Sequence, residues 1–469
     1  MKYVYKRRPF RHQHEALLYT LQNDAAALLM DPGTGKTKVG VDNIGCRYLR
    51  GEVHKVLIVC PRSLRGVWEE HIVSDLPDDI PRLVLLPEST KEFDTRAMKR
   101  LSVDNPLVIL VLSYESNAKI YEKIKRWQPD EIIIDESHYI KTQSAHRSRA
   151  LHHEGPKSKF RIMGSGTPIT KYPLDVYSQF KFLAPWLFDE TWDEFRRHYA
   201  LWGGYYGREV IGYQNLKELA RKVHSVSYRA RIEDVLELPQ RLPPEIIPVK
   251  LPKKIMGAYT RMEQEGIVKL GSGRTAVGDN VLTLALRLHQ LTGGFLGTDE
   301  GNAALHTEKL DACLELTGQH IEVGNKVVVF CAFRWEIEQV TKACSEQGYH
   351  PLTIMGGMSE KVLNENKRKF QEEEQYKVLV CQIDAGGFGH TFTAANVAIF
   401  YSFSNRWESF KQAHDRIYRH GQTKRTYYYY LIVRDTIDEV MLEAMHSKKR
   451  LSDMILNYFN RRGNQHDKR

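Results

Sequence analysis

Two series of short apolar runs constrain the fold of this chain more than any other feature. Longer segments with helical periodicity separate the runs of each series. The first series comprises residues 25–30, 55–61, 106–114, 131–135 and 160–166, and the second comprises residues 326–333, 351–357, 377–383, 396–403 and 426–433. Short buried strands that alternate with crossover helices are typical of parallel sheets. The sequence therefore predicts an α/β fold with two tandem parallel-sheet lobes.

The chain between the two series has a different composition. Segment 180–224 is rich in aromatic and charged residues at helical spacing, which predicts a helical projection from the first lobe. Prolines in segment 237–252 exclude a regular helix and predict an extended crossing. We expect an N-terminal lobe at residues 1–238, a linker with a second helical element at 239–304, and a C-terminal lobe at 305–469.

Composition narrows the function classes. The chain has 68 basic and 58 acidic side chains, a formal net charge of +10, which favours a polyanionic partner without identifying it. The six cysteines are scattered, with no Cys-x-x-Cys pair, and several lie inside apolar runs. Buried thiols without a pairing pattern exclude a disulfide framework and indicate a reducing, cytosolic setting.

Targeting and metal signals are weak. The first ten residues contain no apolar stretch and no run approaches membrane-spanning length, so we expect neither a signal peptide nor a membrane segment. Histidine pairs such as His152 and His153 have no thiolate or carboxylate cluster beside them, which disfavours zinc.

The stretch "MDPGTGKT" follows the first expected strand and opens an expected helix. Gly33 and Gly35 permit positive φ, so that backbone N–H groups can turn toward a phosphate. Lys36 supplies a point charge for the β- and γ-phosphates, and the Thr37 hydroxyl suits Mg²⁺. This strand, loop and helix predict an ATP phosphate cradle that includes Thr34.

The stretch "IIIDESH" places adjacent carboxylates at the end of an expected buried strand. Two neighbouring buried carboxylates are costly unless a cation or hydrogen bonds compensate them. We expect Asp135 to hold Mg²⁺, directly or through water, and Glu136 to polarise the attacking water. The alternative for an isolated Asp-Glu pair is a solvated turn.

The motifs "DPGTGKT", "DESH" and "SGTP", in that order, resemble the first-lobe motifs of superfamily 2 helicases. The stretches at residues 56–72 and 112–116 narrow the resemblance to the Swi/Snf-type group of double-strand DNA translocases. The resemblance spans roughly Phe10 to Val433 and implies two RecA-like lobes with short helical insertions between them.

The resemblance also implies roles for first-lobe residues. Gln13 would recognise adenine, the alternative being an exposed amide near a helix start. Ser165 and Thr167 would couple the nucleic-acid track to ATP. Four further residues would lie along that track: Pro61, Arg62, Ser63 and Ser113.

The second-lobe stretch "DAGGFGHTFTAAN" continues the family order. Its glycines, Gly387 among them, allow close backbone approach to a phosphate of DNA or ATP. The hydroxyls of Thr391 and Thr393 can contact the DNA backbone.

The stretch "QAHDRIYRHGQT" contains Gln412, Arg416 and Arg419 at spacings of four and three, which predicts that they share one helix face. Two guanidinium groups on one face repel unless an anion lies opposite. The resemblance implies that both arginines are arginine fingers, which contact the γ-phosphate and stabilise its charge during hydrolysis. It also implies that Gln412 senses the bound nucleotide. The alternative is a surface salt-bridge face with Asp415.

Three residues depart from the family pattern: Met30 before the cradle, Thr142 where asparagine is common, and Leu363 where arginine is frequent. No accessory domain is apparent, so we expect a minimal motor of bacterial or phage type in the cytoplasm.

The favoured function is an ATP- and Mg²⁺-dependent motor, a monomer, that translocates mainly on double-stranded DNA. One alternative is a helicase that unwinds or branch-migrates forked or junction DNA, with the aromatic segment 182–207 as a wedge. Ordinary helix packing is the other explanation of that segment. A second alternative is a nucleotide-gated DNA clamp with little turnover.

Overall fold

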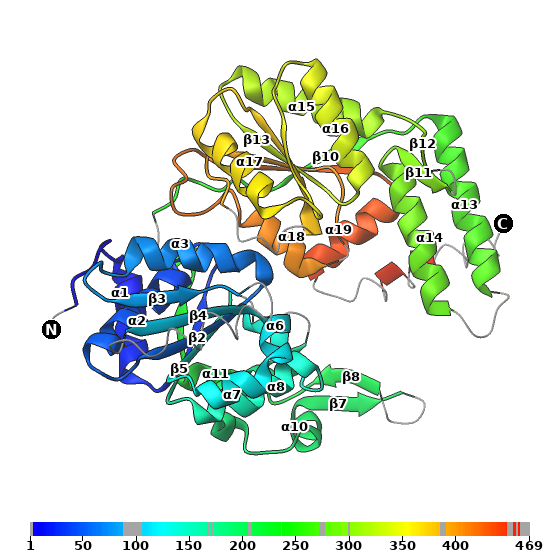
Figure 1. Cartoon of the computed structure of the whole chain (residues 1–469). Helices are drawn as coiled ribbons and strands as arrows, with labels where there is room; N and C mark the ends of the chain where they lie inside the picture. Colours follow the sequence, from blue (N-terminus) through cyan, green and yellow to red (C-terminus); the bar gives the residue numbers. More distant parts are fainter. Residues whose placement is uncertain are drawn as a thin grey trace. The chain divides into compact units, whose positions relative to one another are not determined.

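The computed structural model divides into two units, Met1–Glu237 and Leu238–Arg469, each described here by itself (Figure 1). It describes residues 3–87, 106–166, 168–169, 172–204, 209–235, 237–271, 277–298, 301–384, 391–404, 406–447, 454–455 and 458–459.

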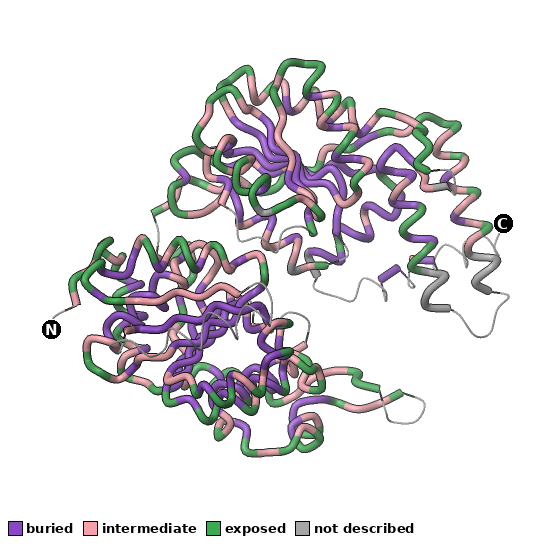
Figure 2. Tube along the Cα trace, viewed as in Figure 1, coloured by how far each residue is buried: buried purple, intermediate pink, exposed green. Residues whose placement is uncertain are grey.

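The first lobe is built on a parallel sheet, seven-stranded in its described part. Its order is β3 (Arg82–Leu85), β4 (Leu107–Ser113), β2 (Lys55–Cys60), β5 (Glu131–Asp135), β6 (Phe160–Gly164), β1 (Ala25–Met30) and β9 (Ser227–Ala230). The central strands are nearly continuous apolar runs because helices cover both faces of the sheet (Figure 2).

Alternate strand residues enter two cores, one on each face. Leu57 and Val59 of β2 point into one core, and Val56 and Ile58 point into the other. One face packs on α6 (Tyr114–Lys119), α7 (Tyr121–Trp127), α8 (His146–Glu154) and α9 (Val176–Leu183); the other packs on α1 (Arg11–Gln22), α2 (Lys36–Leu49) and α3 (Arg65–Asp75).

The segment predicted as a helical projection contains α10 (Trp192–Tyr199) and α11 (Leu216–Ser225), but between them lies an antiparallel hairpin, β7 (Ala200–Gly203) and β8 (Glu209–Tyr213). Paired glycines after Trp202 disfavour a helix, and the β-branched residues of β8 favour a strand. The aromatic side chains Phe188, Phe195 and Tyr199 are buried in the first-lobe core. These three side chains therefore contribute to ordinary packing.

The second lobe carries a parallel sheet, six-stranded in its described part. Its order is β10 (Glu245–Val249), β17 (Tyr427–Val433), β16 (Val397–Phe400), β13 (Val327–Cys331), β15 (Val378–Gln382) and β14 (Leu352–Ile354). One face packs on α15 (Glu308–Glu322) and α16 (Arg334–Glu346), and the other packs on α17 (Glu360–Glu372), α18 (Trp407–His414) and α19 (Ile437–Ser447).

An insertion precedes the core of the second lobe. It contains α13 (Lys253–Gly271), α14 (Val277–Thr292) and an antiparallel hairpin of β11 (Phe295–Thr298) and β12 (Gly301–Ala304). The remaining short elements are α12 (Ile232–Val235) and the 3-10 turns η1 (Arg62–Leu64), η3 (Ser137–Ile140), η4 (Gly155–Lys157), η5 (Pro173–Asp175) and η6 (Pro185–Phe188).

The predicted α/β fold with two tandem parallel-sheet lobes is confirmed, and every predicted strand is present. All six cysteines are buried and free, as their apolar surroundings predict. Within the described ranges, no helix combines the length and apolar character needed to cross a membrane.

Candidate active site

The site motifs of the first lobe follow strands β1, β2, β4, β5 and β6. Because these strands are parallel, their carboxyl ends meet at one edge of the sheet. The sheet thereby gathers segments that are far apart in sequence.

The loop between β1 and α2 has the backbone that a phosphate cradle needs. Gly33 has φ 84° and Gly35 has φ 92°, both in the left-handed region that favours glycine. Lys36 begins α2, and its Nζ donates hydrogen bonds to the carbonyl oxygens of Met30 at 2.8 Å and Asp31 at 3.3 Å. The side chain of Met30 is fully buried in the core, so this departure from the family pattern leaves the loop itself unchanged.

Gln13 lies directly against this loop. Its Nε2 donates to the Thr34 carbonyl oxygen at 3.1 Å, and its Oε1 accepts from the Phe10 N–H at 3.0 Å. A Cβ added at Gly35 would lie 2.2 Å from Gln13 Nε2. The neighbouring His12 ring also bonds to the Thr34 carbonyl, at 2.8 Å. Gln13 is therefore a buried partner of the loop, and the alternative of an exposed amide is wrong.

Asp135 ends β5 as a buried carboxylate with defined hydrogen bonds. Its Oδ2 accepts from Trp68 Nε1 at 3.1 Å, and its Oδ1 accepts from the Glu136 N–H at 3.0 Å. Tyr114 donates its hydroxyl to the Asp135 carbonyl oxygen at 2.7 Å. Burial, followed by the adjacent Glu136 carboxylate, raises the pKa of Asp135, while Lys36 opposes that rise.

Glu136 adopts a left-handed backbone, with φ 54° and ψ 56°. This conformation is strained for a residue other than glycine, and such strain clusters at functional sites. His138 Nδ1 lies 3.2 Å from Glu136 Oε2. The backbone thus turns Glu136 away from the direction of β5.

The cradle lysine and the strand-end carboxylate come together at Gly164, the last residue of β6. A Cβ at Gly164 would lie 3.3 Å from Asp135 Oδ1 and 3.6 Å from Lys36 Cδ. Thr37 lies in the first turn of α2, next to Lys36. Positive-φ glycines, a lysine and a buried carboxylate that needs a cation fit a nucleotide phosphate with Mg²⁺.

The residues expected along the nucleic-acid track share this edge. Cys60 pairs with Ser113 in the register of β2 and β4, so Pro61, Arg62 and Ser63 follow a strand that neighbours Ser113. Arg62 is exposed, whereas Pro61 and Ser113 are buried. Ser113 is the N-cap of α6, and its Oγ accepts from the Ser116 N–H at 3.1 Å.

Ser165 follows β6 and is fully buried, and its N–H donates to the Leu28 carbonyl oxygen at 3.1 Å. A Cβ at Gly166 would lie 2.8 Å from Pro32 Cδ, so this segment runs against the phosphate loop. Thr167 and Gly387 lie outside the described residues.

In the second lobe, two glutamines fix the segment that contains Thr391 and Thr393. Gln371 Nε2 donates to the Thr391 carbonyl oxygen at 3.1 Å, and its Oε1 accepts from the Ala394 N–H at 2.8 Å. Gln422 Nε2 donates to the carbonyl oxygens of Ala395 at 2.7 Å and Ile417 at 2.9 Å. Gln371 therefore ties this segment to α17 through partly buried contacts, and Gln422 ties it to the turns after α18 through buried contacts.

The prediction that Gln412, Arg416 and Arg419 share one helix face is wrong. Gln412 lies on α18, but this helix ends at His414 and both arginines follow it in turns. Asp415 has φ −79° and ψ 3°, which leaves the helical conformation at the C-cap, and the Gln422 N–H closes a turn onto the Arg419 carbonyl at 3.0 Å.

The two arginines are nevertheless close to each other. Burial, followed by the charge of Arg419, lowers the pKa of Arg416 to about 10. Arg416 is 3% exposed, and its guanidinium carbon lies 5.5 Å from the Phe392 ring centre. Arg419 Nε donates to the Asp415 carbonyl oxygen at 2.6 Å. Turn geometry, not helical spacing, brings these like charges together.

Sequence reasoning missed several residues that orient the site. Trp68, Tyr114 and Gln422 all bond to site segments from other elements. All three lie inside stretches that resemble family motifs, so their place in those motifs was the signal that could have identified them.

A phosphate cradle beside a buried strand-end carboxylate, on the first of two parallel-sheet lobes, defines a P-loop ATPase of the helicase type. A SNF2-related domain matches residues 12–293, and a helicase conserved C-terminal domain matches residues 308–421. The chain belongs to the SNF2-related family of superfamily 2 helicases, the Swi/Snf type.

Individual relatives agree with this family. The DNA annealing helicase and endonuclease ZRANB3 of Bos taurus is 27% identical over 95% of this chain. A SWI/SNF-related matrix-associated actin-dependent regulator of chromatin subfamily A-like protein 1 homolog of Caenorhabditis elegans is 26% identical over 94% of this chain. This chain spans 40% of the length of the first relative and 61% of the second.

A solved structure, the Sulfolobus solfataricus SWI2/SNF2 ATPase core in complex with dsDNA, is 21% identical, with a TM-score of 0.46 over 97% of this chain and 94% of its own. We draw no conclusion from a likeness of this size.

Proposed function

We propose that this chain is an ATP-driven motor that translocates mainly on double-stranded DNA. The observation that carries the proposal is the convergence of Lys36 and Asp135 at Gly164, beside a loop with two positive-φ glycines. A phosphate-binding lysine and a buried carboxylate at the carboxyl edge of a parallel sheet are the requirements of nucleotide hydrolysis.

Each residue of the cradle has a role in this proposal. The backbone N–H groups of residues 33–37 and the Lys36 ammonium bind the phosphates, and Gln13, which bonds to the same loop, recognises adenine. Thr37 and Asp135 hold Mg²⁺, which neutralises phosphate charge when bound. Glu136 orients and polarises the attacking water.

The second lobe supplies cationic and hydroxyl groups. Arg416 and Arg419 stabilise the charge that develops on the transferred phosphoryl group, and Gln412 senses the nucleotide. Thr391 and Thr393 contact the DNA backbone, with Arg62 and Ser63 of the first lobe. Backbone contacts make binding independent of sequence and sensitive to salt.

DNA as the track is supported by the net charge of +10 and by relatives whose names describe DNA helicases. Strand separation requires a wedge, and burial of Phe188, Phe195 and Tyr199 leaves these side chains unable to form one. Trp186 of the same segment is 58% exposed, so the burial of these three side chains does not by itself exclude unwinding. We favour translocation because the chain belongs to the SNF2-related family. The buried reduced thiols suit a cytoplasmic site of action.

The test is steady-state ATPase activity with duplex DNA, single-stranded DNA, forked DNA and RNA side by side. We expect the largest stimulation by duplex DNA, without release of product strands. Lys36→Ala should abolish the stimulated activity. Preference for forks with strand release would establish the helicase instead, and DNA binding without stimulated turnover would establish the clamp.

A further inference from the structure

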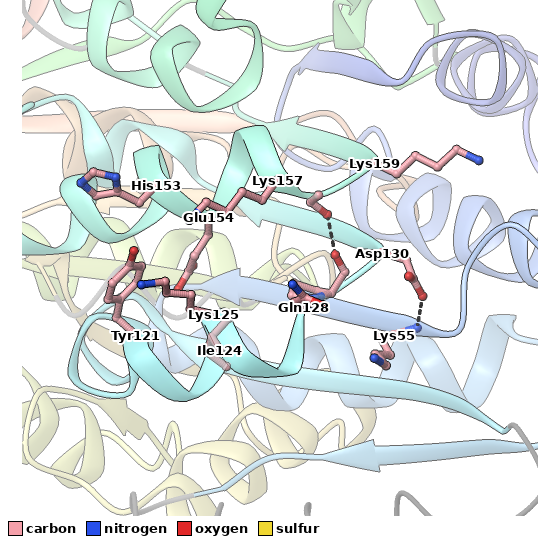
Figure 3. Close-up of a pocket in the computed structure, with 12 residues that line it drawn as sticks. Lys55, Tyr121, Ile124, Lys125, Gln128, Asp130, His153, Glu154, Lys157 and Lys159 are labelled. Carbon is pink, nitrogen blue, oxygen red and sulfur yellow. Dashed lines mark hydrogen bonds between the residues drawn. The ribbon is translucent and has the colours of Figure 1, made fainter.

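A cavity lies in the first lobe (Figure 3), at the edge of the sheet opposite the phosphate cradle. Its volume is about 330 Å³. Lys55 begins β2, Asp130 precedes β5 and Lys159 precedes β6, so the cavity adjoins the amino ends of strands whose carboxyl ends carry the candidate active site. Nothing in the proposed motor function uses it.

The cavity is rimmed by cationic side chains. Lys55, Lys125, Lys157 and Lys159 all line it. The single aspartate of the lining, Asp130, accepts hydrogen bonds from the backbone N–H groups of His54 and Lys55, both at 2.8 Å. Its charge is therefore partly compensated by the backbone. Lys125 Nζ lies 3.7 Å from Glu122 Oε2, which leaves three other lysines of the lining to make it cationic.

Exposed lysines alone are often only solvated, so Glu154 is the decisive feature. Figure 3 shows its side chain extending from α8 toward α7, where Tyr121 and Lys125 lie. Glu154 is 5% exposed, and its Oε2 accepts from Asn117 Nδ2 at 3.1 Å. Within the described part of the chain, its Oε1 has no hydrogen-bond partner. A buried polar atom of this kind is rare and needs a partner.

The protonation state of the Glu154 carboxyl group determines which ligand groups it can hydrogen-bond. Burial raises the pKa of Glu154 to about 8, against the smaller opposing effects of Asn117 and Lys157. The carboxyl group is thus mainly neutral at pH 7 and can donate a hydrogen bond from its O–H. A neutral carboxyl donor in a cavity lined by lysine side chains suits an oxygen anion.

We propose that this cavity binds a compact phosphate ligand with at least two phosphate groups, whose oxygens the lysines neutralise and Glu154 Oε1 hydrogen-bonds. A monocarboxylate would leave most of the lysine charge uncompensated. The volume is at the lower end of small-molecule sites and suits a pyrophosphate group, free or within a nucleotide. The end of a nucleic-acid strand, with its terminal phosphate and the adjacent backbone phosphate, offers related chemistry from a second source.

The test is calorimetric titration of the full chain with pyrophosphate in magnesium-free buffer. All titrations use the Lys36→Ala variant as the starting protein, because the candidate active site can also bind pyrophosphate and this substitution removes that second binding site. We expect one remaining site in Lys36→Ala, weakened at least about 10-fold when Lys157→Glu and Lys159→Glu are added, since reversed charges repel the ligand. The matched control is Lys217→Glu on α11, an exposed lysine of the same lobe outside the cavity, which should leave binding unchanged.

A second pair of variants tests Glu154 itself in the same background. Glu154→Gln keeps a donor and should retain binding, whereas Glu154→Leu should weaken it. The proposal is overturned if Lys36→Ala binds no pyrophosphate, or if the lysine reversals and the Lys217 control bind alike. If 5′-phosphorylated oligonucleotides displace pyrophosphate and 5′-hydroxyl oligonucleotides do not, the natural ligand is a strand end. If nucleoside diphosphates displace it, the natural ligand is a free small molecule. Neither outcome depends on DNA-stimulated ATPase activity.

Discussion

The indole Nε1 of Trp68 donates a hydrogen bond of 3.1 Å to Asp135 Oδ2, which joins α3 to the end of β5. Trp68 is 2% exposed and packs over α2, where a Cβ added at Gly40 would lie 2.9 Å from its ring. The bond therefore fixes one oxygen of the carboxylate that we propose as a Mg²⁺ ligand.

Trp68→Phe keeps an aromatic ring but removes this donor. Outer-shell partners of metal ligands commonly change affinity or activity 10- to 100-fold, so we expect the Mg²⁺ concentration for half-maximal ATPase activity to rise about 10-fold. The measurement is DNA-stimulated ATPase activity across a Mg²⁺ titration. Trp186→Phe, at a tryptophan 58% exposed in the same lobe, is the control. Equal effects of the two substitutions would contradict an orienting role for Trp68.

Gly35→Ala should abolish nucleotide binding. Its φ of 92° is unfavourable for alanine, and the new Cβ would collide with Gln13. Gly51→Ala is a matched control, because Gly51 has φ 69° but no atom within 4 Å of an added Cβ. Both variants should lose about 1–2 kcal/mol of stability from the backbone strain. Nucleotide titration and thermal unfolding separate the two effects, and retained nucleotide binding in Gly35→Ala would contradict the cradle.

Arg416→Ala and Arg419→Ala should each lower kcat by a factor on the order of 10³ and leave ATP binding largely intact, because a finger acts on transition-state charge. Arg425→Ala, an exposed arginine just beyond the same turns, should change neither quantity. Steady-state kinetics and equilibrium nucleotide binding are the measurements. A large loss of ATP affinity at unchanged kcat would disprove the finger role.

Glu154→Gln should stabilise the protein at alkaline pH. Burial raises the pKa of Glu154 to about 8 in the folded chain, against an ordinary value of 4.5, so the folded state binds the extra proton between these values. Stability from this group is present below about pH 4.5 and is lost as pH rises to about 8. The variant, which stays neutral, should exceed the wild type by a few kcal/mol near pH 9 and match it near pH 4.

Denaturant unfolding at the two pH values measures this difference. Glu122→Gln, whose side chain is 67% exposed, is the control and should show no pH-dependent difference from the wild type. A Glu154→Gln variant with the same pH dependence as the wild type would show that the carboxyl group ionises normally.

The central strands could be predicted from sequence because burial on both faces requires continuous apolar runs. The edge strands β3, β9 and β10 were not predicted, because an edge strand is less buried and tolerates polar residues. Pro248 of β10 illustrates this: the strand pairs only with β17 in the described sheet, so a residue without an N–H is accepted there.

The phosphate loop could be predicted because its residues are consecutive and each has a local role. The hydrogen bonds of Trp68, Tyr114 and Gln422 could not, because they join residues from separate elements. The positions of Arg416 and Arg419 were mispredicted because helical spacing was assumed to continue past His414, where the backbone enters turns. Leu363 is 3% exposed in the second-lobe core, which explains an apolar residue at a position where the family often has arginine.

One backbone contact in the second lobe has a mechanical consequence. The Phe392 N–H donates to the Arg416 carbonyl oxygen at 3.0 Å, and the Phe392 ring lies beside the Arg416 guanidinium. Phe392 stands between the two threonines that we propose as DNA contacts. Under the proposed function, a displacement of the loop that contains Thr391 and Thr393 would pass through this backbone hydrogen bond directly to the turn that contains Arg416, and so would couple DNA contact to phosphoryl transfer.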